Sequence, residues 1–392
     1  MANSDALMKT YNRIPVDFVR GEGSWLFDSE NNRYLDAISG IAVCALGHNH
    51  PGFIKAVQQQ VATLVHTSNL YGVPLQEELA EKLCQASGMS SVFFCNSGAE
   101  GNEAAIKMAR MFGHNKGVDL PGIIVMEGAF HGRTMGALTA TYSSRHQGGF
   151  APFLDGFYRV PFNDIPAIEE CLKKHPNIVA VLVEPIQGEG GICIPASDYL
   201  NKLRSLCDAN DMLLMLDEVQ TGNGRTGKYF AYQHSGILPD VVSTAKGLGN
   251  GFPIGACLAS GRAADIFHPG HHATTFGGSP LACAAALAVN EALLTEGLLE
   301  NASVQGDRIK FGLSMRLQNC PHVVAIRGNG LMIGVELDQP CAELVALARE
   351  KALLINVASG NVVRLVPPLT LTETESDLII DTVSELIEDF GK

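Results

Sequence analysis

Leu-Leu-Met-Leu-Asp-Glu-Val-Gln at residues 213–220 and Val-Val-Ser-Thr-Ala-Lys-Gly at residues 241–247 are the two stretches that decide the fold of this chain. Each is an apolar run short enough to be a buried strand, and each ends in a charged residue followed by turn-forming residues. Asp217 and Lys246 are therefore expected to face each other at the mouth of an α/β sheet. An ordinary ion pair between strand ends would explain these two residues equally well.

A carboxylate and a lysine in this arrangement suit one organic cofactor. Pyridoxal phosphate needs a lysine that binds its aldehyde covalently and a carboxylate that keeps its pyridine nitrogen protonated, so that the ring accepts electrons. Three glycines occur within the five residues after Lys246, where they favour neither a helix nor a strand but let the backbone approach a ligand closely. These neighbours favour the cofactor over the structural ion pair.

The composition is typical of a globular enzyme with two unequal domains. The chain has 392 residues, of which 46% are apolar and 18% charged, and this length exceeds what one hydrophobic core usually supports. The net charge of -13 argues against a general nucleic-acid surface. No apolar run is long enough to span a membrane, and residues 1–13 lack the apolar core of a signal peptide. We therefore expect a cytoplasmic protein without nucleic-acid or membrane partners.

Cysteine and histidine usage gives no indication of a metal site. The ten cysteines are scattered without a Cys-x-x-Cys pair, so they are expected to be reduced thiols in the cytoplasm. Histidines cluster at positions 48–50 and 268–272, but without a nearby residue at metal-ligand spacing. We expect no bound metal.

Apolar runs and amphipathic stretches alternate from about residue 76 to 300. Strands are expected at 92–95, 123–126, 178–184, 213–219 and 241–244, and helices at 100–112, 199–209 and 280–296. This order predicts an α/β fold with a mostly parallel sheet that is covered by helices on both faces.

The two ends of the chain are expected to form a smaller α+β domain. A hairpin at 323–337, a helix at 341–352, a strand at 362–366 and a last helix starting at the capping box 372–375 follow the large domain, and a short hairpin at 25–28 and 33–35 precedes it. We predict residues 1–47 as the N-terminal part of the small domain, 48–285 as the large cofactor-binding domain and 286–392 as the C-terminal part of the small domain.

A phosphate site is expected where residues 95–100, Cys-Asn-Ser-Gly-Ala-Glu, join a strand directly to a helix. The small residues Ser97, Gly98 and Ala99 leave backbone N–H groups free for an anion, and the helix dipole favours negative charge there. Such a turn is weak support by itself. It gains weight because it lies at the carboxyl end of a strand in the same predicted sheet.

Taken in order, the motifs of this chain resemble the class-III (fold type I) pyridoxal-phosphate aminotransferases, and among them the acetylornithine aminotransferase group. The resemblance runs nearly end to end, and it implies that the mostly parallel sheet is of the seven-stranded type. It is carried by the segments at 11–15, 47–51, 66–69, 97–103 (Ser-Gly-Ala-Glu-Gly-Asn-Glu), 130–134 (Phe-His-Gly-Arg-Thr), 184–191 (Glu-Pro-Ile-Gln-Gly-Glu-Gly-Gly), 217–222, 245–249, 274–278 (Thr-Thr-Phe-Gly-Gly) and 364–368.

The resemblance implies a role for each residue around the cofactor ring. Lys246 would bind the cofactor covalently and then move a proton as base and acid. Asp217 would pair with the pyridine nitrogen, Gln220 would lie near the phenolic oxygen, and Phe130 would stack on the ring face. A core-packing role is the alternative for Phe130.

The phosphate and the subunit arrangement follow from the same resemblance. Gly98 and Ala99, with Ser97 beside them, would hold the phosphate through the backbone. Thr275 would reach the phosphate of the partner subunit, which implies a homodimer with shared active sites, and Thr274 is expected beside the substrate.

Substrate binding is assigned to three further residues by the resemblance. Arg133 would hold a substrate carboxylate, for which a guanidinium group is suited. Glu184 would cover Arg364 while the donor reacts at its terminal amine. Glu184 would then move away, so that Arg364 binds the α-carboxylate of glutamate or 2-oxoglutarate.

The function implied is transamination of the terminal amine of N2-acetylornithine with 2-oxoglutarate, a step of arginine biosynthesis. Ornithine, succinylornithine, succinyldiaminopimelate and 4-aminobutyrate aminotransferases are the alternatives within the family. Gly40 falls where ornithine aminotransferases carry a tyrosine, which leaves room for an acyl group. A semialdehyde mutase would not use the Glu184–Arg364 exchange, and a non-catalytic cofactor-binding regulator should carry a DNA-binding segment. Cys44, where asparagine is common in the family, and Cys193 have no assigned role.

Overall fold

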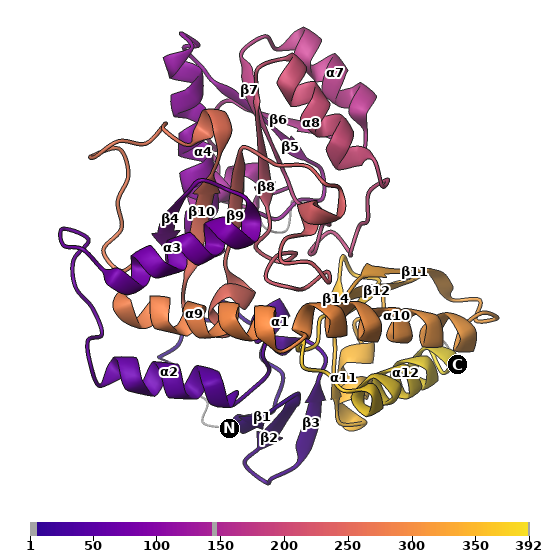
Figure 1. Cartoon of the computed structure of the whole chain (residues 1–392). Helices are drawn as coiled ribbons and strands as arrows, with labels where there is room; N and C mark the ends of the chain where they lie inside the picture. Colours follow the sequence, from indigo (N-terminus) through magenta and orange to yellow (C-terminus); the bar gives the residue numbers. More distant parts are fainter. Residues whose placement is uncertain (1–5, 143–146, 391–392) are drawn as a thin grey trace.

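A seven-stranded sheet forms the centre of the computed structural model, which describes residues 6–142 and 147–390 (Figure 1). Its five inner strands are short, mostly apolar runs that are buried along their whole length, as expected for a sheet covered on both faces. The two edge strands are partly exposed. In spatial order they are β4 (Ser91–Cys95), β10 (Gly255–Ala259), β9 (Val241–Thr244), β8 (Leu213–Asp217), β7 (Ile178–Val183), β5 (Gly122–Met126) and β6 (Phe157–Val160). Only β10 runs antiparallel to its neighbours, so the predicted mostly parallel α/β sheet is confirmed.

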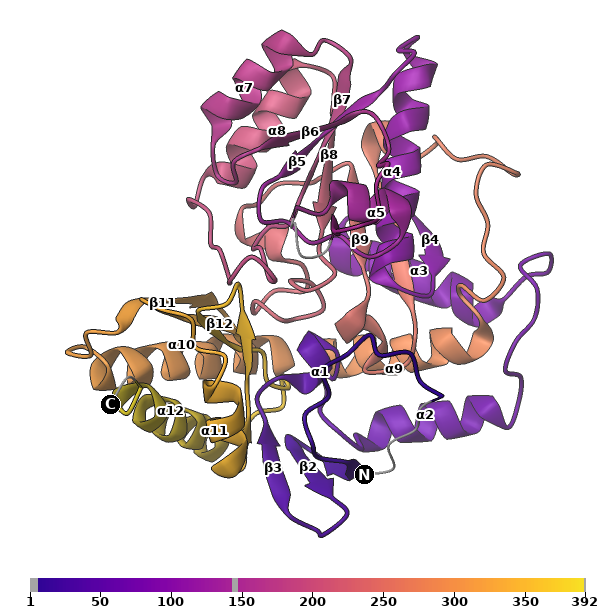
Figure 2. The same ribbon diagram turned by 180° about the vertical axis from the view of Figure 1, so that it is seen from behind.

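The sheet separates two apolar clusters, because successive side chains of a strand point to opposite faces. In β5, Ile123 and Val125 pack with the helix α4 (Gly98–Asn115) on one face. Ile124 and Met126 belong to the larger cluster on the other face. That cluster also contains residues of α3 (Pro74–Ser87), α7 (Ile165–Lys174), α8 (Tyr199–Ala209) and α9 (Pro280–Thr295). Figures 1 and 2 show α4 and α8 on opposite sides of the strands.

The ends of the chain meet in two smaller sheets. One has the order β1 (Phe18–Glu22), β2 (Trp25–Asp28), β3 (Arg33–Asp36) and β13 (Leu353–Leu354), and the other has β11 (Val323–Asn329), β12 (Met332–Leu337), β15 (Val362–Leu365) and β14 (Asn356–Ala358). Because β13 pairs with β3, the N-terminal hairpin is completed by a strand more than 300 residues away. Both predicted hairpins are confirmed.

The remaining helices are α1 (Ser39–Ala42), α2 (Pro51–Val61), α5 (Met135–Ala140), α10 (Leu298–Arg316), α11 (Leu344–Glu350) and α12 (Glu373–Glu388). Two predicted helix starts are confirmed: Ser279 caps α9, and Thr372 with Glu375 forms a capping box on α12. Along the described residues no single helix could cross a membrane by length and composition, and only the α9–α10 pair, bent by 67°, passes that test jointly.

Several elements differ from the sequence expectations. The strands β6 and β10 were not expected; β10 has the sequence Gly-Ala-Cys-Leu-Ala, whose small residues carry little strand preference. The strand expected at 213–219 ends at Asp217, because the Asp217 carboxylate accepts the Val219 N–H at 3.0 Å and turns the chain. The helix expected at 341–352 covers only 344–350.

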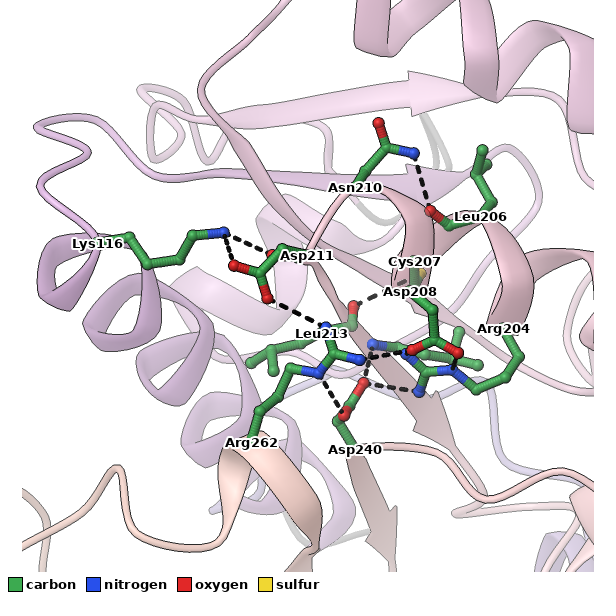
Figure 3. A network of polar contacts seen from close by, with 11 residues as sticks. Lys116, Arg204, Leu206, Cys207, Asp208, Asn210, Asp211, Leu213, Asp240 and Arg262 are labelled. Carbon is green, nitrogen blue, oxygen red and sulfur yellow. Dashed lines mark hydrogen bonds and ion pairs between the residues drawn. The ribbon is translucent and has the colours of Figure 1, made fainter.

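An ion-pair network closes the amino-terminal edge of the sheet, opposite to Asp217 (Figure 3). Asp240, which precedes β9, accepts from Arg204 of α8 at 2.7 Å and pairs with Arg262 at 3.2 Å. The same carboxylate accepts the N–H of Leu214 in β8 at 2.8 Å. One nearly buried carboxylate therefore joins a helix, two strands and the turn after β10.

Asp240→Asn should lower the free energy of unfolding by about 1–3 kcal/mol, because hydrogen bonds to a charged group are lost at a site with little water. Urea unfolding followed by circular dichroism measures this. The matched control is Glu170→Gln, which breaks an exposed pair with Lys174 and should change the free energy by less than about 0.5 kcal/mol. Equal effects of the two variants would contradict a structural role for Asp240.

Candidate active site

A cavity of about 400 Å³ lies where β4, β8 and β9 end. Carboxyl ends of parallel strands are the usual binding edge of an open α/β sheet. Nine of the twelve site residues predicted from the sequence line this cavity: Ser97, Gly98, Ala99, Phe130, Arg133, Glu184, Asp217, Gln220 and Lys246. Arg364, Thr274 and Thr275 do not line it.

Lys246 begins the short 3₁₀ helix η2 (Lys246–Gly249) just after β9, with a φ of 45°. No hydrogen bond or ion pair joins its amine to another of the described residues, and burial lowers the pKa of the amine. A buried lysine amine whose pKa is lowered gives up its proton more readily than an exposed one and can act as a nucleophile. This unpaired amine is what a covalently bound carbonyl cofactor requires.

Asp217 stands at the end of β8 and receives three N–H donors. Its Oδ2 accepts from Asn102 Nδ2 at 2.7 Å and lies 2.7 Å from His131 Nδ1, while Oδ1 accepts from the Val219 N–H at 3.0 Å. Burial opposes the charged form of His131, but the Asp217 carboxylate outweighs this and raises the pKa of the imidazole. A charge-assisted network therefore fixes a carboxylate that faces the cavity.

Asn102 and His131 were missed as functional residues. Both lie inside the motifs at 97–103 and 130–134 that carried the family resemblance. Asn102 also donates to the backbone carbonyl of His131 at 2.8 Å and accepts from Ser243 of β9. Only the folded chain brings Asn102 and His131 to the Asp217 carboxylate, because these three residues come from a helix, a loop and a strand.

The predicted phosphate site is the start of α4. The Ser97 side chain accepts the Glu100 N–H at 3.3 Å and caps the helix, and the first backbone bond of the helix is Gly101 N–H to the Ser97 carbonyl. The N–H groups of Gly98 and Ala99 thus have no intrahelical acceptor. A side chain at position 98 would clash with Val219, since its Cβ would lie 2.6 Å from a Val219 methyl group. The turn therefore presents backbone N–H groups to the cavity at a helix N-terminus, where an anion fits.

The predicted pairing of Glu184 with Arg364 is wrong. Glu184 follows the last residue of β7 and accepts backbone N–H groups of Phe130 at 3.0 Å and Gly188 at 3.1 Å. Burial raises the pKa of this carboxyl group. The carboxylate that reaches Arg364 is Glu189, whose Oε1 lies 2.5 Å from Arg364 Nη1. The motif at 184–191 contains both glutamates, and its sequence alone did not distinguish them.

The two arginines of the site differ in exposure and in partners. Arg364 of β15 is only 1% exposed, and besides Glu189 it donates to Asn356 at 2.8 Å and to Gln220 at 3.5 Å. Arg133 is exposed, lies 5.6 Å from the Phe130 ring centroid and has no ion pair within the described chain. One guanidinium group, that of Arg133, thus lines the cavity without an ion-pair partner among the described residues. The other, that of Arg364, lies behind the lining residues Glu189 and Gln220 and is covered by Glu189.

The loop that carries Arg133 is held from α4. Glu103 accepts from the hydroxyl of Thr134 and from the N–H groups of Gly136 and Ala137 at 2.9 and 3.1 Å. These are the otherwise unpaired donors at the start of α5. A carboxylate on one helix therefore caps the next one and fixes the loop with Arg133.

Thr274 and Thr275 lie in a second hollow, which His66, Asn69 and Phe93 also line. Thr274 accepts from Asn96, a residue of the main cavity, at 3.3 Å, whereas Thr275 is exposed. Gly40 does not line the cavity, although Val43 does. Within the described part of the chain no three potential ligand side chains cluster as a metal site would require.

Comparisons with known proteins identify the family to which this chain belongs. The family model Aminotransferase class-III matches residues 6–387. Acetylornithine aminotransferase of Nitrosomonas europaea is 55% identical over 97% of this chain and 97% of its own, and acetylornithine aminotransferase 1 of Bordetella parapertussis is 51% identical over 99% and 98%. Among solved structures, ornithine aminotransferase of Toxoplasma gondii matches with a TM-score of 0.94 at 33% identity, covering 97% of this chain and 92% of that one. N-acetylornithine aminotransferase of Stenotrophomonas maltophilia matches with a TM-score of 0.85 at 36% identity, covering 97% of both chains.

Proposed function

Because the chain belongs to the class-III aminotransferases, we propose that it transfers the terminal amino group of N2-acetylornithine to 2-oxoglutarate. The products are N-acetylglutamate 5-semialdehyde and glutamate, as in arginine biosynthesis. Relatives called acetylornithine aminotransferase, 48–55% identical over nearly the whole chain, support this donor. The observation that carries the proposal is the pair of unequal arginines beside one reactive lysine, since two different substrates must use one cavity.

The cofactor of class-III aminotransferases is pyridoxal phosphate, and the cavity fits it. Lys246 offers the unpaired amine, Asp217 the fixed carboxylate for the pyridine nitrogen, and Gly98 and Ala99 the backbone donors for the phosphate. When bound, the cofactor withdraws electrons from the carbon that carries the reacting amine. Phe130 supplies an aromatic wall of the cavity.

Lys246 is the acid and base of the reaction in this proposal. Once substrate has displaced it, its Nζ accepts the proton from the carbon that bears the amine and delivers it elsewhere on the same assembly. The lowered pKa of the amine suits this task, because an amine that stays protonated cannot accept a proton. Asp217 and its donors do not move during the transfer.

The two arginines explain how one site accepts two substrates. Acetylornithine has one carboxylate, which the free Arg133 binds, and its terminal amine then extends towards Lys246. Glutamate has two carboxylates, so the second must displace Glu189 from Arg364. Glu189 therefore takes the role that the sequence had assigned to Glu184: it neutralises Arg364 while the uncharged chain of acetylornithine passes.

A homodimer with shared active sites fits the exposed residues around Thr275. Leu70, Tyr71 and Phe276 are 87%, 71% and 64% exposed, and Asn69 donates to carbonyl groups of the segment 274–278. Apolar groups of this size on one surface are typical of a protein interface. In the cytoplasmic dimer that we propose, Thr275, which lies outside its own cavity, contacts the phosphate of the second subunit.

Steady-state kinetics with a panel of amino donors and 2-oxoglutarate test the function. We expect the highest kcat/KM for acetylornithine, against succinylornithine, ornithine, succinyldiaminopimelate and 4-aminobutyrate. Lys246→Ala should lower turnover on the order of 10⁴-fold or more, because both the nucleophile and the base are lost. Borohydride reduction of the wild-type enzyme followed by peptide mapping should place the cofactor on Lys246. A label on another lysine, or ornithine as the best donor, would overturn the assignment.

Glu189→Ala should raise the rate with glutamate relative to acetylornithine by about 10-fold or more, because the covering hydrogen bond to a charged group is removed. Arg364→Ala should lower the rate with glutamate about 100-fold and leave acetylornithine nearly unchanged. Single-turnover absorbance changes of the bound cofactor with each donor measure both. Glu184→Gln is the comparison, since it should affect both donors equally. If only the Glu184 variant changed the ratio of the rates with glutamate and acetylornithine, Glu184 and not Glu189 would be the residue that controls access to Arg364.

Thr275→Val should weaken cofactor binding about 10-fold through the loss of one hydrogen bond to a charged group. Mixed with Lys246→Ala under conditions of subunit exchange, it should form dimers in which one of the two sites is intact. At limiting cofactor, random exchange should restore about a quarter of wild-type activity. Mass spectrometry confirms the exchange. If exchanged dimers are no more active than the parents, Thr275 acts within its own subunit.

A further inference from the structure

The sheet of β11, β12, β15 and β14 carries a row of residues that faces the loop after β7. Arg327 of β11 pairs with Gly334 of β12, and Gly334 pairs in turn with Arg364 of β15. Residues that pair directly across neighbouring strands place their side chains on the same face of the sheet. Two arginines therefore stand on one face of this sheet, and the residue between them has no side chain.

The loop at residues 184–193, here called the Glu189 loop, lies over that glycine. Ile192 is fully buried and has a φ of 53°, and a Cβ atom at position 334 would lie only 3.0 Å from the Ile192 Cβ. Gly191 has a φ of 105°, and a Cβ atom there would lie 3.1 Å from a methyl group of Val362 in β15. The backbone of the loop thus rests directly on the sheet, at a place that only a glycine in β12 leaves open.

Arg327 holds this part of the loop by its backbone. The Nη2 of Arg327 donates to the Gly191 carbonyl at 2.7 Å, and its Nε donates to the Ile192 carbonyl at 2.8 Å. The third nitrogen, Nη1, pairs with Glu336 on the same face of β12. A guanidinium group suits these contacts, because it is planar and presents several N–H donors in fixed directions. Arg327 therefore joins two successive carbonyl groups of the loop to the sheet.

The residue that covers Arg364 belongs to the same loop. Glu189 stands two residues before the first carbonyl that Arg327 binds, lines the cavity, and places its Oε1 2.5 Å from Arg364 Nη1. At the base of the loop, Gln187 and Cys193 exchange backbone hydrogen bonds of 3.1 and 3.0 Å. The stretch between them is a short closed loop with two attachments to one sheet: the carbonyl contacts of Arg327 and the Glu189–Arg364 pair.

The first attachment affects the second. A tether raises the effective concentration of a group at its partner, so the contacts of Arg327 favour the return of Glu189 to Arg364 whenever a substrate carboxylate leaves. Arg327 itself does not line the cavity. If the tether were removed, Glu189 would cover Arg364 for a smaller part of the time, and the second carboxylate of glutamate would meet less competition.

We propose that Arg327 is a positioning residue that sets the preference between the two amino donors by anchoring the Glu189 loop. With the anchor in place, Glu189 covers Arg364, and acetylornithine binds through its single carboxylate at Arg133. Without the anchor, Arg364 is uncovered for longer, so glutamate binds more tightly while the proton transfer at Lys246 is unchanged. The donor preference rests on the function proposed above, whereas the anchoring of the loop does not.

Hydrogen exchange of the holoenzyme, followed by mass spectrometry, tests the anchoring. The variant is Arg327→Gln, and the matched control is Arg308→Gln, since Arg308 of α10 forms its ion pairs with acidic residues of α12. The N–H groups of Gly191 and Ile192, which both donate to a carbonyl within the loop, should exchange roughly 10-fold faster in Arg327→Gln. They should exchange at the wild-type rate in the control. Unchanged exchange in Arg327→Gln would overturn the anchoring.

Single-turnover rates over a range of glutamate and acetylornithine concentrations test the donor preference. In Arg327→Gln the apparent Kd for glutamate should fall about 3- to 10-fold, while the limiting rate with each donor stays within about 2-fold of the wild type. General damage to the fold weakens binding, so tighter binding of glutamate separates the proposed role from a structural one. Arg308→Gln should change neither quantity. Arg327→Lys, which keeps a charge beside Glu336 but lacks the planar fork for two carbonyl groups, should cause a smaller change in the same direction. An unchanged or raised Kd for glutamate in both Arg327 variants would overturn the role in specificity.

The double variant with Glu189→Ala tests whether Arg327 acts through Glu189. In the Glu189→Ala background, Arg327→Gln should cause no further change in the ratio of the apparent Kd values for glutamate and acetylornithine. A further fall of the same size would show that Arg327 acts on the substrates by another route, and it would contradict the proposal. If the wild-type enzyme turned over neither donor, the proposed function would fail, and the exchange rates would still decide whether Arg327 anchors the loop.

Discussion

The charge of Asp217 inside the sheet edge is the constraint on which the site depends. A carboxylate at the end of a buried strand loses its water, and this is costly unless polar donors replace it. Asn102, His131 and the Val219 N–H take that role, and each comes from an element with its own reason to be there. The helix α4 that carries Asn102 packs on one face of the sheet, and its first turn presents the phosphate site to the same cavity. The contacts that hold the Asp217 carboxylate therefore also fix the distance between it, at the proposed pyridine end of the cofactor site, and the first turn of α4, at the proposed phosphate end.

The sequence was sufficient to predict those features that depend on residues close together along the chain. Contiguous stretches show their periodicity and their turn residues directly in the sequence. Examples are the strands ending near Asp217 and Lys246, the strand-to-helix turn at Ser97 and the capping box at 372–375. The partner of Arg364 could not be chosen this way. Glu184 and Glu189 are five residues apart in one motif, and which of them reaches β15 depends on how the loop after β7 turns back at Gly188. Likewise β10 carries little strand preference and exists because β4 and β9 offer it two ladders.

The two edges of the sheet have different roles: the amino-terminal edge contributes to stability, and the carboxyl-terminal edge carries the groups of the proposed active site. At the amino-terminal edge Asp240 is matched by Arg204 and Arg262, so every charge has an opposite partner (Figure 3). At the carboxyl-terminal edge the pairing of charges is incomplete, because among the described residues no ion pair or hydrogen bond joins the Lys246 amine to another group, and Arg133 has no carboxylate partner. Such unpaired groups cost stability and are usually found where a ligand completes them. Arg364, which Glu189 covers, lies between these extremes, since in the proposed mechanism a substrate carboxylate replaces its partner.

Residues 39–42 form a left-handed turn with four successive positive φ angles, which is a second place near the cavity where the chain is strained. A positive φ costs of order 1–2 kcal/mol at each of Ser39, Ile41 and Ala42, whereas Gly40 adopts it freely. Strain of this kind persists only where the surroundings over-determine it. Here the Asp36 carboxylate accepts the N–H of Ser39 at 2.8 Å, and the Ser39 hydroxyl binds the chain beyond Arg364. The same carboxylate orients His48. A single buried acid therefore holds both the strained turn that precedes Val43 of the cavity wall and the imidazole of His48.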